Sequence, residues 1–151
     1  MAYKILVVDD EPSIVRLVSS TLTARGYEVI TAHDGMEAIT EAKVQKPDLI
    51  LLDVMMPHMD GREARKRLLA DPATKDIPVI HLSAVGDFEQ QLKAVENGVT
   101  DYMTKPFTPS DLAQRVADML DPQKRQAMLN ERHRKEGKLR AIVDIMHRDR
   151  N

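Results

Sequence analysis

Short apolar runs rich in β-branched residues alternate along this chain with longer segments of helical periodicity. The runs are of strand length and lie at residues 4–8, 28–32, 48–53, 77–82 and 99–103. Each is followed by a segment in which apolar residues recur every three or four positions, beginning near residues 12, 34, 61, 87 and 108. This alternation predicts an α/β domain in which five parallel strands are joined by right-handed helical crossovers.

The strand segments also indicate how such a sheet is covered. Their centres, such as Lys4-Ile-Leu-Val-Val8, are apolar on both faces, which is typical of strands buried between two layers of helices. Five units are too few to close the usual eight-stranded barrel. We therefore expect a doubly wound sheet, and the carboxyl ends of its strands are the expected place for a functional site.

Composition narrows the class of protein further. The chain has no cysteine, so it has no disulfide or thiolate chemistry. It has no apolar run long enough to span a membrane, and its first residues lack the pattern of a signal peptide. These features predict a cytoplasmic protein without membrane contact.

Charged and hydroxyl side chains stand at the predicted strand ends. Asp9 and Asp10 follow the first strand, Asp53 ends the third, Ser83 follows the fourth, and Lys105 lies just beyond the fifth. If these strands are neighbours, three carboxylates, a hydroxyl and an ammonium group meet at one edge. Carboxylates that close together favour a hard divalent cation, and we expect Mg²⁺, with Mn²⁺ able to substitute. Such a site suits the stabilisation of a transferring phosphoryl group.

Four sequence motifs carry a resemblance to a known family. They are Val-Val-Asp9-Asp10-Glu-Pro, Asp53-Val-Met-Met-Pro57-His-Met-Asp-Gly61, Leu-Ser83-Ala84 and Asp-Tyr102-Met-Thr-Lys105-Pro106-Phe. In this order, over residues 3–120, the chain resembles the response-regulator receiver domains of two-component signalling, including the chemotaxis regulators. The resemblance implies a flavodoxin-like sheet of strand order 2-1-3-4-5 and Mg²⁺-dependent phosphorylation of an aspartate.

The resemblance also implies roles for the acidic residues. Asp53 corresponds to the phosphoacceptor. Asp10 and Asp53 would supply oxygens to the metal ion, Asp9 would face it through water, and the main-chain carbonyl of Met55 would complete the protein ligands.

Three further residues receive roles from the same resemblance. Lys105 would pair with Asp53 and then with a phosphoryl oxygen, and Ser83 would donate a hydrogen bond to another. Tyr102 would change rotamer as a switch between two states. Met55 and Val85 flank the expected path of a hydrolytic water and cannot hydrogen-bond it, which predicts a long-lived phosphoryl group.

Other conspicuous side chains are expected to be structural. His81 shares strand parity with Ser83 and reads as a core histidine with satisfied ring nitrogens. Arg62, Arg65, Lys66 and Arg67 read as a solvated basic face of the third helix.

The last residues differ from the rest of the chain. Residues 1–120 carry 13 Lys/Arg against 19 Asp/Glu, whereas residues 121–151 carry 9 against 5. We expect a receiver domain over residues 1–121 and a charged helical extension over 122–151, without a separate output domain. Within the extension, Gly137 is expected to interrupt the chain before an amphipathic helix with Leu139, Ile142, Val143 and Met146 on one face. This face is expected to cover the receiver or a second copy of the chain, unless the segment is a linker to an output domain.

The sequence therefore predicts a phosphoacceptor that assists its own phosphorylation and dephosphorylation but is not a turnover enzyme. Its expected partners are a histidine kinase or phosphotransfer protein and a downstream protein target. A homodimer is an open alternative, and nucleic-acid binding is disfavoured because the basic tail lacks interleaved aromatic residues. Three other functions are weighed against this one: a constitutive receiver-fold scaffold, a receiver excised from a larger regulator with a DNA-binding or enzymatic output domain, and a phosphatase of the haloacid-dehalogenase type. The last is disfavoured because no second aspartate follows two residues after the first strand's carboxylate.

Overall fold

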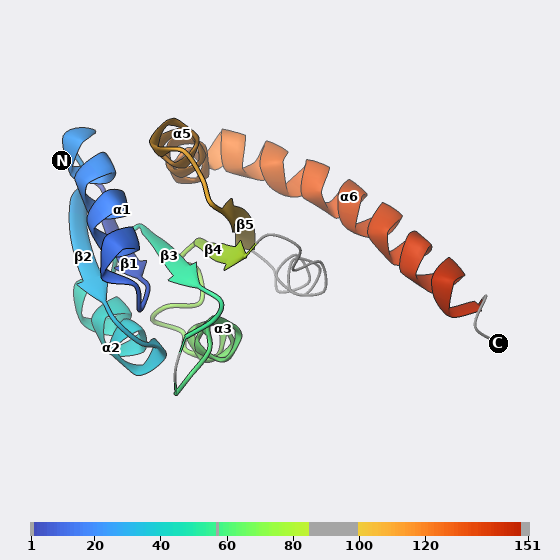
Figure 1. The fold of residues 1–151 in the computed structure, drawn as a ribbon, viewed down its shortest axis with the longest axis horizontal. Helices are drawn as coiled ribbons and strands as arrows, with labels where there is room; N and C mark the ends of the chain where they lie inside the picture. The colour runs from blue at the N-terminus through green and yellow to red at the C-terminus, as the bar shows by residue number, and fades with distance from the viewer. Residues whose placement is uncertain (1, 57, 85–99, 149–151) are drawn as a thin grey trace.

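A computed structural model of the chain describes residues 2–56, 58–84 and 100–148. It contains one five-stranded parallel sheet of order β2-β1-β3-β4-β5 (Figure 1). The strands are β1 (Lys4–Val8), β2 (Glu28–Ala32), β3 (Leu49–Asp53), β4 (Val79–Ala84) and β5 (Thr100–Lys105). The predicted doubly wound fold and its strand order are confirmed.

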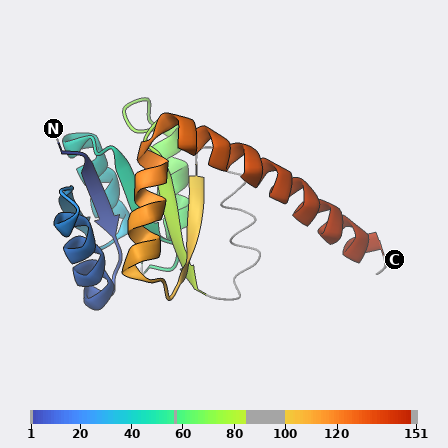
Figure 2. The same cartoon turned by 90° about the horizontal axis from the view of Figure 1, so that it is seen from above.

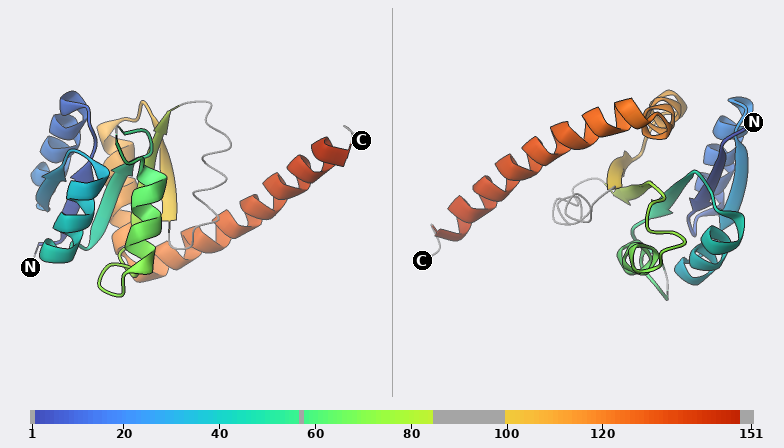
Figure 3. Two further views of the ribbon diagram at one scale, coloured as in Figure 1. Left: turned by 90° about the horizontal axis from the view of Figure 1, so that it is seen from below. Right: turned by 180° about the vertical axis from the view of Figure 1, so that it is seen from behind.

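Two layers of helices cover the sheet. The helices are α1 (Pro12–Ala24), α2 (Gly35–Gln45), α3 (Gly61–Ala70), α5 (Pro109–Leu120) and α6 (Pro122–Arg148). Helices α1 and α5 lie on one face, as Figure 2 shows, and α2 and α3 lie on the other, in front of the sheet in the left panel of Figure 3. The helix expected from Asp87 lies outside the described residues.

Alternation along the strands explains why both faces are apolar. Leu49 and Leu51 of β3 pack into the α1–α5 core, while Ile50 and Leu52 pack into the α2–α3 core. The strand register then determines which residues lie side by side at the carboxyl edge of the sheet. Val8 pairs with Leu52, Leu52 with His81, and His81 with Tyr102. Because the strands are parallel and in this register, the residues that follow Val8 and Leu52 reach the same edge of the sheet.

Helix starts follow the sequence at two of the predicted positions. The Asp34 carboxylate accepts a hydrogen bond from the backbone N–H of Glu37, and the Thr108 hydroxyl accepts one from the backbone N–H of Asp111. Strand β4 runs two residues beyond the predicted Leu82, because Ser83 and Ala84 pair with Thr104 and Lys105.

The extension departs from the prediction. Helix α6 is continuous over 27 residues, so Gly137 does not interrupt it. One glycine costs a helix only about 1 kcal/mol, and good helix formers flank this one. The Asp121 carboxylate starts α6 by accepting hydrogen bonds from the backbone N–H groups of Gln123 and Lys124. No helix within the described residues is both long and apolar enough to cross a membrane. The division into residues 1–121 and 122–151 stays a prediction.

Candidate phosphoacceptor and metal site

Three carboxylates meet at the carboxyl ends of β1 and β3. Each of Asp9, Asp10 and Asp53 offers an oxygen, and these oxygens lie within 4.8 Å of one another. Asp9 and Asp53 are buried, with 0% and 4% of their surface exposed, whereas Asp10 is exposed at the rim. The three residues expected from the sequence are therefore neighbours in space, and their donor set is one that a hard divalent ion prefers.

Lys105 approaches this cluster from the end of β5. Its Nζ donates a hydrogen bond to Asp9 Oδ2 at 2.8 Å and lies 3.5 Å from Asp53 Oδ1. Asp9 is thus the nearer partner, although the resemblance named Asp53. The other oxygen of Asp9 accepts from the backbone N–H of Glu11 at 2.9 Å, which holds the carboxylate in place. The peptide bond from Lys105 to Pro106 is cis.

These contacts shift two pKa values. Burial and then the negative charge of Asp9 raise the pKa of Asp53 to about 7, against the opposing influence of Lys105 and of the Met55 backbone. Burial disfavours the charge of Lys105, but the hydrogen bond to Asp9 and the charge of Asp53 outweigh it and raise the pKa of Lys105. A buried carboxylate beside a second one has its charge stabilised when a cation is near, so the donor set fits a metal ion.

Hydrogen bonds and a close backbone approach hold the residues next to Asp53 in place. The Met55 N–H donates to Asp53 Oδ1 at 3.3 Å, and the Gly61 N–H donates to the Val54 carbonyl at 2.8 Å. A Cβ atom on Gly61 would lie 2.1 Å from the Asp53 carbonyl oxygen. Only glycine allows α3 to begin this close to the acceptor strand.

Ser83 and Tyr102 stand on the neighbouring strands. Ser83 is buried, and its hydroxyl has no hydrogen-bond partner within the described part of the chain. Tyr102 is half-buried and lines a hollow beside Phe107. The Met55 side chain is 60% exposed next to the acceptor. Val85, the other residue expected near the hydrolytic water, lies outside the described residues.

The predicted basic face of α3 is wrong at one residue. Lys66 and Arg67 are exposed, but Arg65 is fully buried, and burial lowers the pKa of Arg65 to about 10. It lies near His81 of β4, which is also fully buried. Burial and then the charge of Arg65 lower the pKa of His81 to about 4, so this histidine is neutral.

His81 meets the expectation of a satisfied core histidine only in part. Among the described residues its ring nitrogens make no hydrogen bond of good geometry, and a weaker interaction with the Leu52 backbone opposes the lowering of its pKa without offsetting it. Hydrophobic periodicity places charged residues on the exposed face of a helix, so it could not predict that Arg65 is buried. The strand parity shared by His81 and Ser83 was the only sequence sign that this histidine faces the α3 side.

A partly buried ion pair was also missed. Arg115 of α5 donates to Asp101 of β5 at 2.7 Å, and Asp101 is 3% exposed. Its position inside a predicted strand is the signal that could have identified Asp101, because an aspartate there needs a compensating charge.

Comparison with known proteins is consistent with this geometry. The family described as the response regulator receiver domain matches residues 5–117. The alkaline phosphatase synthesis transcriptional regulatory protein PhoP of Bacillus subtilis is 47% identical over 120 residues, which cover 80% of this chain and 49% of PhoP.

Two solved structures extend the comparison. The chemotaxis response regulator CheY4 of Vibrio cholerae has a TM-score of 0.74 and 36% identity, over 79% of this chain and 99% of CheY4. NtrX of Brucella abortus has a TM-score of 0.74 and 27% identity, over 96% of this chain and 30% of NtrX. The chain spans about half the length of the first curated relatives that it matches.

Proposed function

Because this chain belongs to the response regulator receiver domain family, we propose that it is a phosphoacceptor whose modification on Asp53 switches its protein contacts. The observation that carries the proposal is the convergence of Asp9, Asp10, Asp53 and Lys105 at one edge of the sheet. A histidine kinase or phosphotransfer protein is the proposed donor. The cytoplasm, where such donors present their phosphoryl groups, is the proposed location.

In the proposed reaction, an oxygen of Asp53 attacks the phosphorus of the donor. A bond forms between that oxygen and phosphorus, and the bond to the donor's leaving group breaks, with its electron pair staying on the leaving group. Lys105 is close enough to Asp53 to neutralise a phosphoryl oxygen after transfer, and the Ser83 hydroxyl is available to donate a hydrogen bond to another.

Asp10 and Asp53, with the Met55 carbonyl, are the proposed protein ligands of Mg²⁺, and Asp9 is the proposed residue that faces the ion through water. The metal ion would supply charge neutralisation of the phosphoryl oxygens. The raised pKa of Asp53 supports this assignment, because the ion would favour the ionised form that acts as the nucleophile.

Tyr102 is the proposed switch residue. It pairs with His81 in the sheet and lines a hollow at the outer side of β5, so a change in its rotamer would alter the surface offered to a target. Such a switch works only if the target binds the two states with different affinity.

Incubation with Mg²⁺ and a small acyl-phosphate donor, followed by intact-mass measurement, tests the proposal. The wild type is expected to gain one phosphoryl group, and Asp53→Asn is expected to gain none. Asp76→Asn is the matched control, because Asp76 is an exposed aspartate away from the cluster. A chelator should abolish the gain. An unmodified wild type would favour the constitutive scaffold, and rapid multiple turnover of the donor would favour the phosphatase.

A second candidate is that this chain forms part of a larger regulator. The observation that favours it is the structural match to NtrX. The matched region covers 96% of this chain but only 30% of NtrX. Relatives such as PhoP carry the name of transcriptional regulators and are about twice as long as the matched segment. The reading frame around codons 1–151 tests this candidate. The described residues themselves give no reason to propose nucleic-acid contact.

A further inference from the structure

Methionines are the only sulfur-containing side chains of this chain, which has nine of them and no cysteine. A two-electron oxidant such as hydrogen peroxide converts an accessible thioether to a sulfoxide. Met36, Met55 and Met146 are 54%, 60% and 53% exposed, whereas Met103 and Met119 are buried in the core. Of the methionines that the structure describes, three are therefore exposed enough to react readily with a dissolved oxidant.

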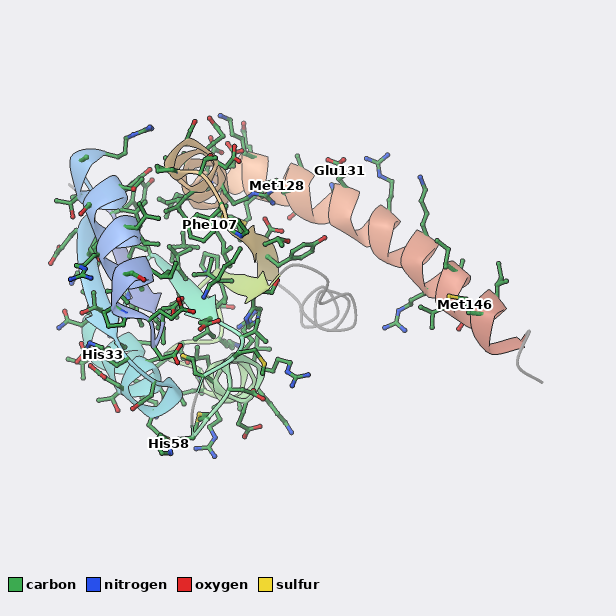
Figure 4. All side chains as sticks on the ribbon, in the orientation of Figure 1. His33, His58, Phe107, Met128, Glu131 and Met146 are labelled. Atoms are coloured by element: carbon green, nitrogen blue, oxygen red, sulfur yellow. The ribbon has the colours of Figure 1, made fainter. Side chains whose placement is uncertain are left out.

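Of these three methionines, Met55 is the one that adjoins the acceptor. Met146 lies near the far end of α6, well away from the strand ends, as Figure 4 shows. Met36 lies at the start of α2, and its sulfur accepts a hydrogen bond from Arg67 of α3 at 3.7 Å. Met55 follows Asp53 by two residues, and its backbone N–H donates to Asp53 Oδ1 at 3.3 Å. The exposed thioether of Met55 is thus attached to the backbone that holds the acceptor carboxylate.

The segment between β3 and α3 contains two further methionines, which provide an internal comparison. Met56 and Met59 are each only 9% exposed and pack into the α2–α3 core. Met59 also lies against the start of α2, where a Cβ atom on Gly35 would be 2.9 Å from its sulfur. Close packing of this kind shields a sulfur from a dissolved oxidant. One short segment therefore holds one accessible thioether and two protected ones, and the accessible one is the nearest to Asp53 along the chain.

The exposure of Met55 also places it where water approaches the acceptor. Asp53 is 4% exposed and Asp10 is exposed beside it, so solvent reaches the acceptor carboxylate across this rim. Methionine is unbranched and has three rotatable side-chain bonds, which allow its end group to move over a neighbouring site. A thioether is a weak hydrogen-bond acceptor, whereas the sulfoxide oxygen makes the same side chain polar. Oxidation would therefore replace an apolar group at the rim by one that binds water.

We propose that Met55 is a site of reversible oxidation by peroxide, and that its sulfoxide shortens the lifetime of the phosphoryl group on Asp53. This inference rests on the proposed phosphoacceptor function. The lone pair of the Met55 sulfur attacks one peroxide oxygen, so that an S–O bond forms and the O–O bond breaks. The departing hydroxide takes the proton from the transferred oxygen and leaves as water, and the two electrons that sulfur loses reduce the peroxide. The sulfoxide oxygen then orients a water for attack on the phosphoryl group.

Peptide mass spectrometry after brief treatment with hydrogen peroxide tests the first part, and fragment masses separate the adjacent Met55 and Met56. Sulfoxide is expected to form at Met55 at least about fivefold faster than at Met56 or Met59, because the latter two are buried. Asp53→Asn is expected to show the same order, since oxidation does not need a phosphoryl group. Equal rates at the three methionines would overturn the proposal.

The decay of the phosphoryl group tests the second part. Met55→Leu keeps the other two exposed thioethers, whereas the double variant Met36→Leu and Met146→Leu keeps that of Met55. Each protein is oxidised, freed of peroxide and phosphorylated with Mg²⁺ and a small acyl-phosphate donor. Its decay after removal of the donor is followed by intact mass and compared with that of its own unoxidised sample. Oxidation is expected to speed decay about fivefold in the wild type and the double variant, and to leave the decay of Met55→Leu unchanged.

Treatment of the oxidised protein with the two methionine sulfoxide reductases, one for each sulfoxide epimer, and a thiol reductant is expected to restore the slow decay. Equal acceleration in Met55→Leu would overturn this inference alone. So would an unchanged or slower decay in the double variant when Met55 carries the sulfoxide. A wild type that gains no phosphoryl group before oxidation would instead overturn the phosphoacceptor proposal, and this inference with it, so the two failures can be told apart.

Discussion

The strand-end cluster around Asp53 and the pair formed by Arg65 and His81 are both buried in one small domain, yet they respond to a proton in opposite ways. At the strand ends, burial and Asp9 raise the pKa of Asp53 to about 7. Between α3 and β4, burial and Arg65 lower the pKa of His81 to about 4. The strand-end cluster therefore favours binding of a proton or a cation, whereas the Arg65–His81 pair disfavours protonation of His81.

The difference follows from which charges the fold brings together. The strand ends combine several carboxylates with one ammonium group, so a further positive charge is stabilised there. Arg65 already places a positive charge beside His81, so a second positive charge, on the His81 ring, is destabilised. The comparison indicates that burial alone does not identify a functional site. The sign of the neighbouring charge decides whether a buried group can change its state.

The largest expected effect comes from removing the cation of the strand-end cluster. Lys105→Ala is expected to slow phosphorylation of Asp53 by about 100-fold, because the developing charge loses its nearest side-chain cation. The rate of mass gain with a small acyl-phosphate donor measures it. Lys75→Ala serves as the control, because Lys75 is an exposed lysine outside the cluster. Equal rates for Lys105→Ala and the wild type would remove Lys105 from the proposed mechanism.

His81→Met is expected to stabilise the fold in acid. The pKa of His81 is lower in the folded state than its ordinary value of 6.5, so the unfolded chain binds more protons and stability is lost as pH falls from about 6.5 toward 4. Methionine removes this loss, by about 3 kcal/mol at pH 4. Denaturant unfolding at pH 4 and 7 measures it, with His58→Met, an exposed site, as the control. An unchanged pH dependence in His81→Met would contradict the assignment.

Asp53→Asn is expected to show the reverse pH dependence. The pKa of Asp53 is raised above its ordinary value of 3.8, so its contribution to stability is lost as pH rises through about 7. The variant should therefore be more stable than the wild type at pH 8 and similar to it at pH 4. Thermal unfolding across this range measures the difference. Added Mg²⁺ should stabilise the wild type more at pH 8 than at pH 5, and the variant less than the wild type at both.

The smallest effect concerns the exposed edge of the acceptor site. Met55→Asn is expected to speed loss of the phosphoryl group by about fivefold, since an amide beside Asp53 can orient a water that the thioether cannot. The decay of phosphorylated protein after removal of the donor measures it. Met36→Asn makes the same change at an exposed methionine of α2. Equal decay rates in the two variants would contradict the predicted long-lived phosphoryl group.

The same contrast separates what the sequence could predict from what it could not. Alternating apolar runs predicted the five strands within about two residues, because strand cores have a strong period-two and buried-run signal. The clustering of Asp9, Asp53 and Lys105 followed from parallel strands ending at one edge. Both inferences depend on topology, which the order of elements nearly determines.

Arg65 could not be placed in this way. A charged residue in a helix is normally solvated, and only the packing of α3 against β4 shows that this one is buried. The 2.8 Å contact from Lys105 to Asp9 rather than Asp53 also depends on side-chain geometry that spacing does not encode. Gly137 was misread because glycine lowers the stability of a helix by an amount that its neighbours can offset.

The contact between Gly61 and the Asp53 carbonyl has one more consequence. Any larger residue at position 61 would push the first turn of α3 outward, and that turn is joined to the acceptor loop through the Val54 carbonyl. Residues 54 and 61 are thus held together by one backbone hydrogen bond. Val54 directly follows Asp53, so a shift of the Asp53 backbone would reach the first residue of α3 through the hydrogen bond from the Gly61 N–H to the Val54 carbonyl.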